Sequence, residues 1–167
     1  MKNMSQYING NLFKLITKAS RQLNYDTYVV GGYVRDLLLE RPSNDIDVVT
    51  VGSGIELARK TAALIDERKE VKYYGRFGTA MIRMKDKEIE FVGARKESYD
   101  PSSRKPFVEN GTLEDDQNRR DFTINAMAIS LNEDTFGTLV DPFNGVQDLE
   151  DKIIRTPLNP DVTYSDD

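Results

Sequence analysis

Two carboxylates stand two residues apart in the short apolar segment DIDVVT, at Asp45 and Asp47. In a β-strand, the side chains of residues i and i+2 lie on the same face, so these two project together while Ile46 and Val48 point into the core. Ionised carboxylates that lie so close repel each other, and each raises the pKa of the other unless a cation compensates. A divalent ion such as Mg²⁺ would compensate, because it binds one or two carboxylates together with substrate phosphates. The alternative is a strand end at the surface with two solvated aspartates.

A pair of glycines precedes this segment. Residues 28–30 predict a short apolar strand, Gly31 and Gly32 follow it, and a helix is predicted just after them. Glycines at such a junction let the backbone approach a ligand, and the N–H groups at the start of a helix suit a phosphate. Arg35 lies one turn into the helix, where its guanidinium would bind phosphate oxygens. Neither G-x-G-x-x-G nor the P-loop ending G-K-[ST] is present, and an ordinary tight turn is the alternative.

The glycines and the carboxylates are close enough in sequence to form one site. Twelve residues separate Gly32 from Asp45, which leaves room for one helix and a return loop. Glu90, in the segment KEIEFVG, is the candidate for a third carboxylate on an adjacent strand, because it alternates with the apolar Ile89 and Phe91. The alternative for Glu90 is an ordinary outward-facing strand residue.

Composition limits the chemistry that is available. The chain has 167 residues, which suits one domain, and its net charge of −5 argues against a broad basic surface that grips nucleic acid. It has no cysteine, so thiolate nucleophiles and zinc–thiolate sites are excluded. It has no histidine either, so acid–base chemistry must use carboxylates, lysine, tyrosine or a bound metal. The sequence shows neither a signal peptide nor a membrane span, and we expect a soluble cytoplasmic protein.

Hydrophobic periodicity predicts the elements that position these residues. Helices are predicted over 9–23, 34–39, 55–66, 113–120 and 146–152, and strands over 28–30, 46–51, 71–74, 80–84, 89–92, 126–130 and 138–140. Residues 94–112 are polar and contain two prolines, so we expect a long exposed loop there. Several neighbouring strands are joined by short turns, which predicts an α/β or α+β fold with a mixed sheet.

Three motifs together resemble the head domain of the class II tRNA nucleotidyltransferase and bacterial poly(A) polymerase family. They are VVGGYVRDLLLERPSNDIDVVT, RRDFTINAMA at 119–128 and LVDPFNGVQDL at 139–149. The resemblance covers roughly residues 10–165. It implies a DNA polymerase beta-like nucleotidyltransferase fold, a mixed sheet with flanking helices, and it implies that residues 1–167 form one head domain.

The resemblance also implies roles for individual residues. Asp45 and Asp47 would bind the metal, and Glu90 would be the third catalytic carboxylate. The residues that would bind the nucleoside triphosphate and its ribose are Gly31, Gly32, Arg35, Arg120, Asp121 and Asn125. The implied cofactor is a pair of Mg²⁺ ions, with Mn²⁺ as a substitute.

The implied reaction is transfer of a nucleotide to an RNA end. The 3′-hydroxyl would attack the α-phosphorus of ATP or CTP, and pyrophosphate would leave, with two metal ions clamping the attacking and leaving oxygens. We expect CMP and AMP to be added to the 3′ end of tRNA, which is CCA addition, since Gly78 and Thr79 follow GRF here. The alternatives are a poly(A) polymerase, an A-adding enzyme, and a non-catalytic nucleotide-binding or nucleotide-sensing domain.

The base-selecting motif of this family, an acidic pair followed by P-L-R and an arginine-rich helix, does not occur in the sequence. In the family that helix belongs to the neck, and the neck, body and tail hold the tRNA. We therefore expect this chain to contain the head alone, to bind tRNA mainly through regions outside it, and to be weakly active by itself.

Overall fold

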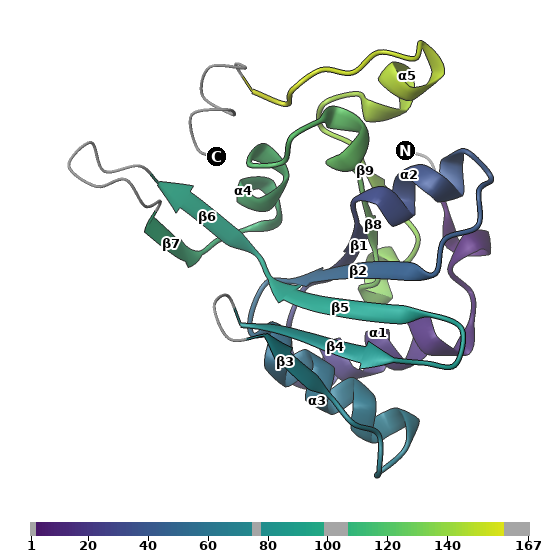
Figure 1. The fold of residues 1–167 in the computed structure, drawn as a ribbon, viewed down its shortest axis with the longest axis vertical. Coiled ribbons are helices and arrows are strands. Elements are labelled where there is room, and N and C mark those ends of the chain that lie inside the picture. The colour runs from purple at the N-terminus through teal and green to yellow at the C-terminus, as the bar shows by residue number, and fades with distance from the viewer. Residues whose placement is uncertain (1–2, 75–77, 99–106, 159–167) are drawn as a thin grey trace.

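The computed structural model describes residues 3–74, 78–98 and 107–158 (Figure 1). Seven strands in this described part form one sheet. In order across the sheet they are β3 (Lys72–Tyr74), β4 (Thr79–Arg83), β5 (Glu88–Gly93), β2 (Asp45–Thr50), β1 (Thr27–Val30), β8 (Ala128–Ser130) and β9 (Leu139–Val140). Strands β2 and β5 pair in parallel, and the other neighbours pair antiparallel. The mixed sheet that the sequence predicts is confirmed.

Helices flank this sheet, as Figure 1 shows. They are α1 (Asn11–Leu23), α2 (Gly32–Leu38), α3 (Gly54–Ile65), α4 (Leu113–Asn118) and α5 (Gly145–Glu150), with short 3₁₀ turns at Ser5–Tyr7, Thr123–Asn125 and Glu133–Thr135. Helix α3 begins where the Ser53 hydroxyl accepts a hydrogen bond from the N–H of Glu56, a standard N-cap. None of the helices in the described residues has the length and apolar run that a membrane span requires.

The main core lies between one face of the sheet and the helices α1 and α3. Ile46 and Val48 of β2 and Phe91 of β5 are at most 2% exposed and belong to it, together with Ile16 and Leu57 from the two helices. Burial of these large apolar side chains fixes which face of each strand is turned inward, because a shift of one residue would move them all to solvent. The intervening residues of β2 and β5, which include the predicted site carboxylates, are thereby forced onto the opposite face.

A second, smaller apolar cluster lies on that opposite face. It contains Val30, Val49, Ala94 and Ala128, with Leu113 of α4 packed against it. Helix α4 therefore covers part of the face that carries the carboxylates.

The prediction of a long loop over 94–112 is wrong for part of its length. Strands β6 (Arg95–Ser98) and β7 (Phe107–Asn110) pair with each other as an antiparallel hairpin, and the N–H of Gly111 donates to the carbonyl of Ala94 at 2.9 Å. These two strands pair only with each other in the described residues and form a sheet separate from the seven-stranded one. Strands outside the core need no alternation of apolar residues, and these two lack it, which is why the sequence pattern did not predict them. Residues 99–106, which contain both prolines, lie outside the described part. The other predicted helices and strands are present, with small shifts at their ends.

The first testable prediction concerns the core face of β5. Replacing Phe91, which is fully buried, with alanine removes contacts and leaves a cavity, and we expect it to lower the free energy of unfolding by about 3–5 kcal/mol. Urea denaturation measures this change. Ile154, which is 69% exposed, is the control, because Ile154→Ala should change stability by no more than about 0.5 kcal/mol. Equal losses for the two variants would contradict the assigned core.

Candidate active site

The three predicted carboxylates lie on one face of the sheet. In the parallel pairing of β2 with β5, Asp47 stands opposite Glu90, and in the antiparallel pairing of β1 with β2 it stands opposite Val30. Adjacent strands lie about 4.8 Å apart, so Asp47 and Glu90 are direct neighbours. Asp45 lies two residues before Asp47 on the same face, at the exposed start of β2.

Electrostatics make Asp47 an unusual carboxylate. Its pKa is raised from 3.8 to about 6, first by burial and next by the negative charge of Glu90, with a smaller contribution from Asp45, whereas the positive charge of Arg120 lowers it. Within the described residues, no hydrogen bond or ion pair reaches the carboxylates of Asp45, Asp47 or Glu90. A half-buried carboxylate beside two like charges is costly when ionised, and a bound cation would remove the cost.

The donor set fits a divalent metal ion. Asp45 and Asp47 offer carboxylate oxygens on one face, and oxygen ligands are those that Mg²⁺ prefers. Among residues 3–74, 78–98 and 107–158, no group of three or more acidic side chains is arranged closely enough to hold a metal by itself. The arrangement therefore suits an ion held by two carboxylates and completed by substrate oxygens, with Glu90 beside it.

Gly31 brings the backbone close to these carboxylates. Its φ of 74° and ψ of −144° are values that residues with side chains rarely adopt. A Cβ at this position would lie 3.3 Å from Nη1 of Arg120 and 3.6 Å from Oδ2 of Asp47, so the glycine leaves room between them. At Gly32 a Cβ would lie 3.1 Å from Nη2 of Arg35. The predicted proximity of the glycine turn and the carboxylates is confirmed.

Arg35 and Asn125 lie far apart in sequence and are hydrogen-bonded to each other. Nη1 of Arg35 donates to Oδ1 of Asn125 at 2.9 Å, and its Nε donates to Oδ1 of Asp36 at 3.2 Å. The amide of Asn125 thus has a defined partner, which links the first and second motifs. Asp121 is different: it is exposed, and within the described residues its side chain makes no hydrogen bond or ion pair.

A cavity of about 290 Å³ lies beside the carboxylates. Its lining consists of Val30, Asp47, Thr79, Glu90, Val92, Arg95, Arg119 and Arg120. Carboxylates and three arginines thus line the same space, which suits a ligand with both a cation and anionic groups. Arg95, Arg119 and Thr79 are absent from the predicted site. Arg119 stands beside Arg120 in the RRD motif, so the sequence offered a reason to include it in the site. Nothing in the sequence marked Arg95 or Thr79 as site residues.

A larger cavity, about 370 Å³, lies between the end of α1 and residues 132–134. It contains none of the predicted site residues, and its ion pair between Arg21 and Glu133 is exposed. The smaller cavity is the candidate active site, because the carboxylate with the raised pKa and the arginines line it.

Comparison with known proteins identifies relatives over most of the chain. The sequence profile of the family described as Poly A polymerase head domain matches residues 27–155. The A-adding tRNA nucleotidyltransferase of Aquifex aeolicus (strain VF5) is 45% identical over 140 residues, which are 84% of this chain and 16% of that protein.

Solved structures are similar as well. The apo form II of a CCA-adding enzyme superimposes with a TM-score of 0.87 and 36% identity, over 99% of this chain and 40% of that chain. A tRNA nucleotidyltransferase complexed with a primer tRNA and an incoming ATP analog superimposes with a TM-score of 0.74 and 39% identity, over 86% of this chain and 39% of that chain. The chain thus spans between 16% and 40% of the length of these proteins.

The raised pKa of Asp47 predicts a stability effect with a definite sign. The folded-state pKa, about 6, lies above the ordinary value of 3.8, so the folded protein prefers the protonated form. The penalty for ionisation is absent below pH 3.8, grows as the pH rises to 6 and is complete above it. At pH 7 without metal, Asp47→Asn should therefore raise the free energy of unfolding by about 1–3 kcal/mol, allowing for solvent screening.

Chemical denaturation at pH 4 and pH 7 in EDTA measures this effect. The gain should shrink at pH 4, and excess Mg²⁺ should stabilise the wild type but not the variant. The control is Asp86→Asn, at an exposed turn, which should be neutral at both pH values. A loss of stability in Asp47→Asn at pH 7 without metal would show that the carboxylate is not strained.

Proposed function

The chain belongs to the poly(A) polymerase head-domain family, and we propose that it carries the nucleotidyl-transfer site of a tRNA nucleotidyltransferase. The proteins to which it is similar include an A-adding tRNA nucleotidyltransferase and a CCA-adding enzyme. The proposed reaction joins the α-phosphate of ATP or CTP to the 3′-hydroxyl of a tRNA end and releases pyrophosphate.

One observation supports this proposal above the others. Asp47, whose pKa of about 6 is raised by Glu90 and lowered by Arg120, lines a cavity that arginines also line. A metal-bound triphosphate has the matching pattern, because its cation meets the carboxylates and its remaining negative charge meets the guanidinium groups. A neutral small molecule would leave both sets of charges uncompensated.

Different residues would bind the metal ions and the nucleotide. Asp45 and Asp47 would hold two Mg²⁺ ions, or Mn²⁺ in their place, and Glu90 would add negative charge beside them. When bound, such ions lower the pKa of the attacking 3′-hydroxyl and neutralise charge on the leaving pyrophosphate. This arrangement needs no histidine base, and the chain contains no histidine.

Polar groups around the carboxylates would bind the nucleotide. Arg120 lines the cavity and would contact phosphate oxygens, and the backbone at Gly31 and Gly32 leaves space for the triphosphate to approach. Arg35, held by Asn125, would form a second cationic contact. Asp121 is exposed and would accept a hydrogen bond from a ribose hydroxyl only if the bound nucleotide reaches it.

The tRNA contact proposed for this chain is confined to the 3′ end. The net charge of −5 is opposite to what a broad contact with an RNA backbone requires. The similar tRNA nucleotidyltransferase was solved with a primer tRNA and an ATP analog, which supports both partners for the site.

Addition of AMP alone is a second candidate within the same chemistry. Identity to the A-adding protein of Aquifex aeolicus is 45%, against 36% to the CCA-adding enzyme in apo form II. Incorporation of labelled CTP and ATP into tRNA that lacks CCA, and into tRNA that ends in CC, distinguishes the two. If labelled ATP is incorporated only into the tRNA that ends in CC, and labelled CTP is incorporated into neither tRNA, the result supports A addition.

The proposal predicts that each aspartate of the pair is essential. We expect Asp45→Asn and Asp47→Asn to lower AMP transfer to tRNA ending in CC by at least about 10³-fold, which corresponds to about 4 kcal/mol. EDTA should abolish wild-type transfer, and Mg²⁺ or Mn²⁺ should restore it.

Asp86→Asn makes the same chemical change at an exposed turn and should retain wild-type transfer. Full activity in Asp45→Asn and Asp47→Asn would rule out the assigned site. A wild-type chain that binds ATP only with Mg²⁺, yet transfers nothing, would instead support the non-catalytic nucleotide-binding alternative.

A further inference from the structure

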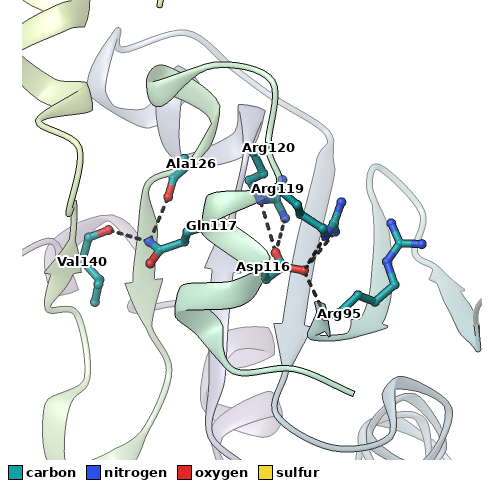
Figure 2. A network of polar contacts seen from close by, with 7 residues as sticks. All are labelled: Arg95, Asp116, Gln117, Arg119, Arg120, Ala126 and Val140. Carbon is teal, nitrogen blue, oxygen red and sulfur yellow. Dashed lines mark hydrogen bonds and ion pairs between the residues drawn. The ribbon is translucent and has the colours of Figure 1, made fainter. Parts of the chain in front are cut away.

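Two adjacent arginines share one buried carboxylate in α4 (Figure 2). The side chain of Asp116 is 0% exposed, whereas those of Arg119 and Arg120 are 20% and 18% exposed. Nε and Nη2 of Arg119 donate to Oδ1 of Asp116 at 3.1 and 2.9 Å. Nε and Nη2 of Arg120 donate to Oδ2 at 3.3 and 3.0 Å. Each carboxylate oxygen therefore takes one edge of one guanidinium group.

This pairing determines which edge of Arg120 remains for other contacts. A guanidinium has five N–H donors in a fixed planar fork, and Asp116 occupies the edge formed by Nε and Nη2. The remaining nitrogen, Nη1, lies 3.3 Å from the point where a Cβ on Gly31 would stand, and Oδ2 of Asp47 lies 3.6 Å from the same point. The outer edge of Arg120 is thus turned toward Gly31 and the carboxylate of Asp47.

The charges in this group do not cancel. Asp116 carries one negative charge and accepts from two guanidinium groups, so the group keeps a net positive charge on the cavity side. A buried carboxylate requires such partners, because an unpaired one would be strongly disfavoured. The excess positive charge is available to an anion in the cavity.

Helix α4 itself is anchored firmly to the sheet. Thr112 and Asp115 form a reciprocal capping box at its start. The buried Gln117 donates from Nε2 to the carbonyl of Ala126 at 2.9 Å and to that of Val140 at 3.2 Å, contacts that Figure 2 shows beside the arginines. The Asp116 carboxylate is therefore fixed in place relative to the sheet that carries the active site.

We propose that Asp116 is a positioning residue, whose buried carboxylate holds Arg119 and Arg120 ready to receive the polyphosphate of the incoming nucleotide. Arginine side chains are flexible, and ordering them costs conformational entropy when a ligand binds. Because Asp116 already orders both arginine side chains in the folded protein, this entropy is not lost when the ligand binds, and the ligand contacts donors that are already oriented. The inference rests on the proposed function, because it assigns the cavity to a polyphosphate.

Asp116→Asn tests this inference in the full chain. The change keeps the shape of the side chain but replaces one acceptor oxygen with a donor, so one of the two arginine forks is lost. We expect the Kd for sodium tripolyphosphate, measured by calorimetry with Mg²⁺, to rise at least about tenfold, because displaced groups bind their target poorly. The KM for ATP should rise in parallel, whereas Mn²⁺ binding in the absence of nucleotide should stay unchanged, because Asp45 and Asp47 are untouched.

Asp115→Asn is the matched control, since it makes the same change one residue away and loosens the capping box of α4. It should lower stability without weakening tripolyphosphate binding by more than about twofold. Equal tripolyphosphate affinity in Asp116→Asn and wild type would overturn the inference and leave the proposed function intact. If the wild type binds no tripolyphosphate, the proposed function is wrong, and the inference falls with it.

A second measurement needs no folded variant at position 116. In the wild type without ligand, the Nε–H protons of Arg119 and Arg120 should exchange slowly with water, because both donate to a buried acceptor. Their NMR signals can be assigned with Arg119→Lys and Arg120→Lys. Fast exchange, typical of solvated arginines, would show that Asp116 does not hold them.

Discussion

The register between β2 and β5 is the constraint on which the site depends. It sets Asp47 beside Glu90 on one face, while Ile46, Val48 and Phe91 anchor the other face in the core. Burial of the apolar side chains stabilises the fold, and the same pairing forces the two carboxylates together against their repulsion. The strain at Asp47 is thus a consequence of core packing, and a bound cation would relieve it.

The opposite wall of the cavity is organised by a different interaction. Two of its arginines, Arg119 and Arg120, directly follow α4, and they are held by the carboxylate of Asp116, which solvent does not reach. Separate parts of the chain thus supply the negative groups and the positive groups that line the cavity. A ligand that contains both a cation and phosphates can bridge them with little rearrangement of the protein.

Sequence patterns were sufficient wherever a local rule decided the outcome. Alternation placed Asp45 and Asp47 on one face and Glu90 away from Phe91, and Gly31 marked the turn beside them. Contacts between distant segments had no local signal: the hydrogen bond from Arg35 to Asn125 joins residues 90 positions apart. The hairpin of β6 and β7 was missed for a related reason, because its strands pair with each other outside the seven-stranded sheet and their sequences, RKES and FVEN, lack the apolar alternation of the core strands. The resemblance to a family supplied roles such as that of Arg120, which spacing alone did not.

The shared carboxylate of Asp116 has a consequence for how this site can vary. Arg119 and Arg120 are energetically coupled, since the loss of either one leaves the whole negative charge to the other. Substitutions at the two positions will therefore not combine as independent effects. Drift at one arginine changes which residues are tolerated at its neighbour, so the pair and its aspartate are expected to evolve as a single unit.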